Sequence, residues 1–256
     1  MFVNNMKDIY KNILHCKKIG KKLFAILIDP DKVNKKSLNI IITEANQNNI
    51  DYFFVGGSLI SQNKLDECIS LIKENSNIPI ISFPGDSMQV NSKADAILFI
   101  SLISGRNPEM LIGKQVITAP IIREYNLESI STGYMLIDSG KSTSVSYISN
   151  TTPIPHDKND IAVCTSIAGE MLGLKLIYMD GGSGALNSIS KEMIYSVSKN
   201  IDCPLIVGGG INNPEKAIEK LNAGADIIVV GNAIEKNSKL ISEISTKIKN
   251  TKWNAL

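Results

Sequence analysis

Eight short apolar runs constrain the fold of this chain more than any other feature. Each is apolar at both odd and even positions, which is typical of strands buried on both faces of a parallel sheet. Helix-like segments separate them; in one, Asn213 and Pro214 mark a helix start and Gly224 its end. The runs occupy 23–29, 51–57, 78–84, 94–101, 130–138, 174–180, 203–210 and 225–231. The pattern predicts a (β/α)8 TIM barrel, with a doubly wound open sheet as the alternative.

The composition narrows the functional classes. With 27 Lys+Arg against 25 Asp+Glu, the net charge of +2 argues against a nucleic-acid partner. No run approaches the roughly 18 apolar residues of a membrane span. The first twenty residues lack the apolar centre of a signal peptide, and Ile9, Ile13 and Leu14 predict an amphipathic helix instead. No segment has the composition of a linker, so we expect one domain over residues 1–256.

The cysteines and histidines carry no motif. Neither of the two histidines has a partner nearby in the sequence, which argues against a histidine-based metal site or a Ser/His triad. The four cysteines form no CxxC pair; they are Cys16, Cys68, Cys164 and Cys203. They are expected to be small buried apolar residues in a cytoplasmic protein rather than metal ligands.

Glycine-rich segments follow three consecutive predicted strands, the sixth to the eighth. They are "DGGSG" (180–184), "GGG" (208–210) and "GN" (231–232). Glycine lets backbone N–H groups converge on an anion, and a following helix N-terminus adds partial positive charge. The three together predict a phosphate site, with 232–236 as the short extra helix that barrels often use there. Any one of them alone could simply be a tight turn.

Polar side chains also stand at the ends of predicted strands. Asp29 ends the first strand and Ser58 follows the second, an oxygen pair that could bind Mg²⁺; alternatively, Asp29 belongs to an Asp-Pro turn that caps the next helix. Asp180 lies two residues beyond Tyr178, so both side chains should point to the same side of their strand. An acid beside a phosphate site could accept a proton from a substrate hydroxyl, or it could cap backbone amides.

Six segments together resemble the geranylgeranylglyceryl phosphate synthases, in the archaeal-type branch called group II. The resemblance covers nearly the whole chain. The segments are "LIDPDK" (27–32), "VGGS" (55–58), "SLISGRNPEMLIG" (101–113), "YMDGGSGA" (178–185), "VGGGI" (207–211) and "VVGNAIE" (229–235). The last two occur in many phosphate-binding barrels, whereas the combination of the first four is much more specific.

The resemblance implies a prenyltransferase. It would join the C3 hydroxyl of sn-glycerol 1-phosphate to C1 of geranylgeranyl diphosphate, release diphosphate and form an ether lipid precursor. It implies Mg²⁺ held at Asp29 and Ser58, with Asp180 as the base and Tyr178 orienting the alcohol. The residues matching the glycerol phosphate pocket are Tyr178, Met179, Asp180, Gly181, Gly182, Ser183, Gly184, Gly209, Gly210, Gly231 and Asn232. It also implies a homodimer or hexamer, and we expect at most transient contact with a membrane surface.

Two positions depart from the family pattern. Many members carry glutamate where Asp180 stands, which leaves open whether the shorter acid acts directly or through water. Members of the heptaprenyl type carry lysine where this chain has Leu27, and Lys32 could supply a cation from the same loop.

Two further assignments have two interpretations each. Phe99, Leu102 and Ile103 could form the wall of a groove for the prenyl tail, or be ordinary core. The polar segment 138–160 could be a lid over the site or an elaborated loop.

Two other functions are compatible with parts of the sequence. Another phosphate-binding barrel enzyme, such as a flavin oxidoreductase or an amino-acid-pathway isomerase, could share "VGGGI" and "VGN" but would not need "DPDK" and "GGS". A non-catalytic scaffold that binds a phosphorylated metabolite would keep the glycine-rich loops without turnover.

Overall fold

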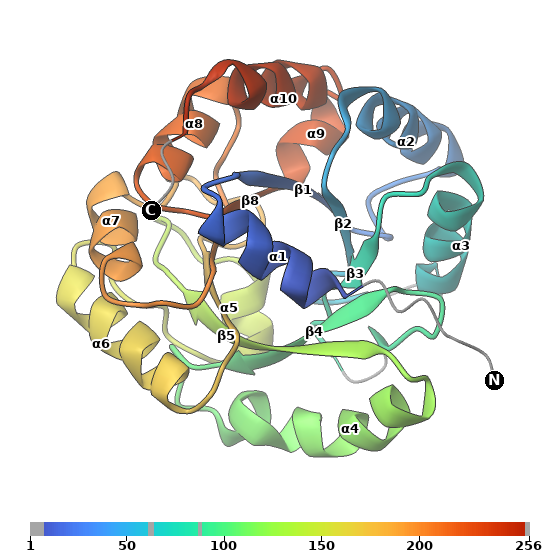
Figure 1. Ribbon diagram of the computed structural model, residues 1–256. Helices are drawn as coiled ribbons and strands as arrows, with labels where there is room; N and C mark the ends of the chain where they lie inside the picture. Colours follow the sequence, from blue (N-terminus) through green and yellow to red (C-terminus); the bar gives the residue numbers. More distant parts are fainter. Residues whose placement is uncertain (1–7, 61–63, 87–88, 254–256) are drawn as a thin grey trace.

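All eight predicted strands are present and close into a parallel barrel in the computed structural model, which describes residues 8–60, 64–86 and 89–253 (Figure 1). β1 pairs with β2 on one side and with β8 on the other, so the sheet has no free edge. The strands are β1 (Leu23–Ile28), β2 (Tyr52–Val55), β3 (Ile80–Ser82), β4 (Ala96–Leu102), β5 (Glu128–Leu136), β6 (Leu176–Asp180), β7 (Leu205–Gly208) and β8 (Ile227–Val230). The TIM barrel is confirmed, and the open sheet is excluded.

Most of the helices form an outer ring around the barrel, whereas the first helix crosses one mouth (Figure 1). The longer ones are α1 (Ile9–Lys18), α2 (Lys35–Asn48), α3 (Leu65–Asn75), α4 (Lys114–Glu124), α6 (Asn159–Met171), α7 (Lys191–Ser198), α8 (Pro214–Asn222) and α10 (Leu240–Asn250). Three short ones are η2 (Glu109–Gly113), α5 (Ser144–Ser149) and α9 (Asn232–Lys236). Within the described ranges, none of these helices combines the length and apolar character that crossing a bilayer requires.

The two faces of each strand are buried in different places, which explains why the runs are apolar at most positions on both faces. On β6, Tyr178 points into the barrel, where it packs with residues such as Phe54 and Ile206. Ile177 and Met179 point outward and pack in the layer between the strands and the helices. Because both layers exclude water, apolar side chains are favoured along most of each strand; Thr132 within β5 is an exception, and its hydroxyl donates to the Ile130 carbonyl over 2.8 Å.

Helix α1 closes the amino-terminal mouth of the barrel and crosses it in Figure 1. Ile9 and Ile13 are buried against the inner cluster, at 2% and 1% exposure. The backbone N–H groups of Ile9 and Tyr10 each donate to the Glu128 carboxylate over 2.8 Å, which satisfies two donors at the helix start. Leu14, expected on the same buried face, is 37% exposed, so the predicted helix is confirmed but its apolar face is narrower.

Replacement of Ile13 by alanine should lower the free energy of unfolding by about 2–4 kcal/mol, because it leaves a cavity under α1. Leu14→Ala removes an equally large side chain from the neighbouring, partly exposed position and should cost less than about 1 kcal/mol. Urea unfolding followed by circular dichroism measures both values. Equal losses for the two variants would contradict the role of α1 as the plug of this mouth.

Candidate functional site

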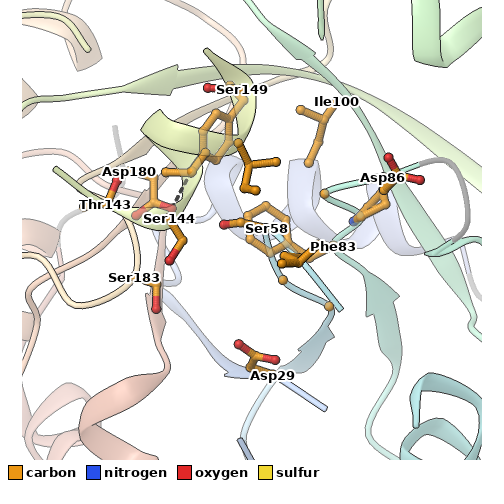
Figure 2. Close-up of a pocket in the computed structure, with 18 of the residues that line it drawn as sticks. Asp29, Ser58, Phe83, Asp86, Ile100, Thr143, Ser144, Ser149, Asp180 and Ser183 are labelled. Carbon is orange, nitrogen blue, oxygen red and sulfur yellow. Dashed lines mark hydrogen bonds between the residues drawn. The ribbon is translucent and has the colours of Figure 1, made fainter. Parts of the chain in front are cut away.

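A cavity of about 750 Å³ opens at the carboxyl ends of the strands, opposite α1. One end is polar and is bordered by Asp29 after β1, Asp180 at the end of β6 and Asn232 after β8. The other end is largely apolar, with walls that include Phe83, Phe99, Ile100, Leu102 and Met110. In Figure 2, Asp180 and Ser183 lie on the left of the site, Ile100 lies on the upper right, and Asp29 lies below them. The volume of the cavity and its combination of polar and apolar lining residues are typical of a small-molecule site.

Asp180 is buried at 7% exposure and still borders the cavity. The Tyr134 hydroxyl donates to its Oδ2 over 2.6 Å, and the Gly182 N–H donates to its Oδ1 over 2.8 Å. Burial raises the pKa of Asp180 above its ordinary value, and the two hydrogen bonds oppose that shift without cancelling it. A carboxylate held this way is a candidate proton acceptor, since desolvation makes it more basic.

Three aromatic rings surround the approach to Asp180. Tyr178 stacks on Phe83 with ring centres 5.4 Å apart and meets Tyr134 edge-on at 5.3 Å. Tyr178 is only 1% exposed, whereas Phe83 and Tyr134 both line the cavity. Tyr178 and Asp180 do lie on the same side of β6, as predicted, with Met179 on the other. The assignment of Tyr178 as the residue that orients an alcohol stays a prediction.

The glycine-rich loops after β6 and β7 need glycine for their own conformation. Gly182, Gly184, Gly209 and Gly210 have φ of 82°, 75°, 82° and 70°, where other residues are strained. A Cβ on Gly209 would also lie 2.6 Å from the backbone nitrogen of Gly181. Part of the reason these loops lack side chains is therefore that the β7 loop packs directly against the β6 loop.

The other members of the predicted phosphate pocket are distributed around these loops. Helix α9 begins at Asn232 directly after Gly231, so the predicted short extra helix is present. Ser183 and Asn232 both border the cavity and hydrogen-bond to each other, with Asn232 Nδ2 3.2 Å from Ser183 Oγ. Met179 directs its side chain into the outer layer, so that only its backbone faces the site.

The predicted metal residues lie on adjacent loops. A Cβ on Gly57 would be 3.3 Å from Cγ of Asp29, so the Asp29 carboxyl lies against the loop that carries Ser58. Gln89 holds this loop, donating to the Gly57 carbonyl over 3.0 Å. The described residues contain no group of three or more His, Cys, Asp or Glu side chains suited to a metal. One carboxylate and one hydroxyl fit Mg²⁺, which takes few protein oxygens and completes its shell with phosphate and water.

The two interpretations of the residues near Phe99 each hold for part of them. Phe99 and Leu102 line the cavity, as the groove interpretation requires, whereas Ile103, just after β4, packs in the outer layer, as the core interpretation requires. The segment 138–160 contains α5, whose residues cover the cavity, and Thr143 before it contacts Gly182.

Tyr134 was missed, although the sequence carries a hint of its position. "YMLID" on β5 and "YMD" on β6 align in the barrel, with Tyr134 beside Tyr178 and Leu136 beside Asp180. The repeated Tyr-Met pair could have suggested this register. It could not have shown that the hydroxyl of Tyr134 reaches diagonally to Asp180.

Known proteins resemble this chain over nearly its whole length. Residues 17–251 match the model of the PcrB family. The chain belongs to the PcrB family. Its relatives include the geranylgeranylglyceryl phosphate synthases of Chitinophaga pinensis, 53% identical over 94% of this chain and 95% of that protein, and of Spirosoma linguale, 50% identical over 90% and 92%. The family expected from the motifs is confirmed.

A solved structure shares the fold of this chain. It is (S)-3-O-geranylgeranylglyceryl phosphate synthase from Thermoplasma acidophilum in complex with sn-glycerol-1-phosphate. It superposes with a TM-score of 0.90 at 32% identity, covering 96% of this chain and all of that one.

Asp180→Asn should raise the melting temperature, and by more at pH 8 than at pH 4.5. The raised pKa means that the folded protein retains the Asp180 proton above the pH at which the unfolded chain loses it. The buried carboxylate therefore costs stability that grows as pH rises through this window, and the amide removes the cost. Scanning calorimetry at both pH values tests this. Asp157→Asn, at an exposed position, is the matched control and should change little. A melting temperature lowered equally at both pH values would contradict the expectation.

Proposed function

We propose that this chain is a prenyltransferase that joins the C3 hydroxyl of sn-glycerol 1-phosphate to C1 of geranylgeranyl diphosphate. The observation that carries the proposal is the position of Asp180. Its buried, hydrogen-bonded carboxyl borders a cavity with glycine-rich loops beside it and an apolar wall beyond. The names of the relatives and the sn-glycerol-1-phosphate bound to the Thermoplasma acidophilum enzyme support the choice of substrates.

Glycerol 1-phosphate is proposed to bind at the polar end, with its phosphate near Gly182, Gly184, Gly209 and Gly210. The Gly182 N–H already donates to Asp180, so other backbone N–H groups of these loops and those at the start of α9 would bind the anion. The phosphate so placed would direct the hydroxyl end of the molecule toward Asp180.

The diphosphate of the prenyl substrate is proposed to lie at Asp29 and Ser58. These residues would hold Mg²⁺, whose charge would stabilise the leaving diphosphate when bound. The apolar tail would follow the wall formed by Phe83, Phe99 and Ile100. Burial of such a chain is favourable by roughly 25 cal/mol per Å² of apolar surface removed from water.

The reaction breaks one bond and forms another at the same carbon. The C1–O bond to diphosphate breaks with its electron pair going to the leaving group, and the C3 oxygen of glycerol phosphate bonds to C1. Asp180 accepts the hydroxyl proton, and Tyr134 keeps its carboxylate oriented. The protein holds the two reactants together, which replaces an encounter in solution by a positioned one.

A cytoplasmic homodimer or hexamer is proposed for the assembly. The four cysteines are all free thiols, which suits a reducing compartment. Ile112, Val116 and Ile117 on η2 and α4 are 61%, 65% and 60% exposed, an apolar face that supports contact with another copy or transient contact with a lipid surface.

Incubation with sn-glycerol 1-phosphate, Mg²⁺ and prenyl diphosphates of several lengths should give an ether lipid, detected by mass spectrometry, with geranylgeranyl diphosphate preferred. sn-Glycerol 3-phosphate is the control for stereochemistry. Binding of glycerol 1-phosphate without any product would favour the scaffold alternative. A bound flavin in the purified protein would favour an oxidoreductase.

Two variants separate chemistry from binding. Asp29→Ala should abolish turnover while leaving the affinity for glycerol 1-phosphate largely intact, because Asp29 serves the diphosphate end. Asp180→Asn should lower kcat by about 10²-fold or more with a smaller effect on KM, since a general base acts in the transition state. Steady-state kinetics measures both, with Asp157→Asn as the control. Full turnover by Asp180→Asn would refute the assignment of the base.

A further inference from the structure

Lys32 lies between the two ends of the polar site and contacts both. Its Nζ is 3.0 Å from Oδ2 of Asp29, on the side proposed for the diphosphate. The same Nζ donates to Ser183 Oγ over 2.9 Å and to Asn232 Oδ1 over 3.3 Å, on the side proposed for glycerol phosphate. Three loops that follow β1, β6 and β8 thus meet at one ammonium group (Figure 2 shows Asp29 and Ser183, two of the residues it joins).

We propose that Lys32 is a positioning residue that allows the two anionic substrates to bind at the same time. The inference rests on the proposed function and adds a role to that site. Both substrates carry phosphate groups, and two polyanions held on adjacent loops repel each other strongly where water is partly excluded. A cation between them converts this repulsion into attraction to a shared partner.

The charges around Lys32 show why a cation is needed there. Asp29 and Glu235 both face this part of the cavity. Burial raises the pKa of Glu235, and the nearby charge of Asp29 raises it further, whereas Lys32 lowers it. Without Lys32, this corner would present carboxylates to two incoming phosphate groups.

The side chain of Lys32 can change partners as the site fills. It is 42% exposed, and an ammonium on a flexible stem is not fixed to one geometry as a guanidinium is. Its three donors now serve Asp29, Ser183 and Asn232. When metal and diphosphate engage Asp29, the ammonium exchanges that contact for phosphate oxygens without leaving its place.

The competing explanation is that Lys32 only ties loops together. A structural tie would weaken glycerol phosphate binding equally whether or not the diphosphate end is occupied. A shared cation has its main effect when both anions are present. The two explanations are therefore distinguished by whether the effect of Lys32 on glycerol phosphate affinity depends on diphosphate being bound.

Calorimetric titration of sn-glycerol 1-phosphate, with and without saturating inorganic diphosphate and Mg²⁺, tests the proposal. Inorganic diphosphate has no allylic carbon, so no reaction intervenes. In the native protein the affinity should change by less than about threefold between the two conditions. With diphosphate present, the affinity of Lys32→Met for sn-glycerol 1-phosphate should be about tenfold or more below that of the native protein. Without diphosphate the difference between the two proteins should be smaller. The loss reflects the removal of a charged hydrogen-bonding partner.

Two further variants complete the test. Lys32→Arg keeps the charge and should restore most of the joint binding. Lys36→Met removes the same charge from an exposed position at the start of α2 and should behave like the native protein. Melting temperatures confirm that the variants fold.

An equal loss for Lys32→Met in both conditions, or no loss in either, would overturn the proposal. This result is distinct from a failure of the proposed function, which would appear as the absence of ether product from the native protein.

Discussion

Parallel pairing around a closed barrel is the constraint on which the rest of the molecule depends. Because every neighbouring pair of strands is parallel, all eight run in the same direction, and every carboxyl end reaches the same mouth of the closed barrel. Asp29, Asp180 and Asn232 are far apart in the sequence and border one cavity for this reason alone. Helix α1 fills the opposite mouth with Ile9 and Ile13, so the cavity opens at one end of the barrel only. Backbone hydrogen bonding, rather than any local motif, assembles the site.

Burial of the Asp180 carboxylate is unfavourable, and neighbouring groups reduce the free energy that it costs. A carboxylate buried to 7% exposure is unfavourable, and the pKa is raised accordingly. The Tyr134 hydroxyl and the Gly182 N–H recover part of that cost, yet each carboxylate oxygen keeps a lone pair beyond the one hydrogen bond it accepts. Asp180 is thus stabilised enough to persist, and under the proposed mechanism it would remain basic enough to accept a proton, a compromise between stability and activity.

The parts of the structure that follow from local pattern could be predicted from the sequence, whereas those that depend on register and packing could not. Apolar runs at both parities located all eight strands, and "GN" after the last strand located α9. Leu14 was assigned to the wrong surroundings, and the choice between wall and core stayed open for Ile103, because the width of a buried face and the direction of a side chain after a strand depend on neighbouring elements. Tyr134 was missed because its contact with Asp180 joins two strands, β5 and β6, and the register between them cannot be predicted from either segment alone.

The high glycine content of "YMDGGSGA" (178–185) has two physical reasons that act together. Gly209 could not approach Gly181 if it carried a side chain, so part of the glycine content serves the packing of one loop on another. That packing brings the two glycine-rich loops side by side, where the N–H groups not already bonded would bind the proposed phosphate. Ser183, the polar side chain within the glycine run, is the point at which Lys32 connects this loop to Asp29. Under the proposal for Lys32, the loop that is shaped by its own packing is therefore also the loop that would couple the binding of one substrate to that of the other.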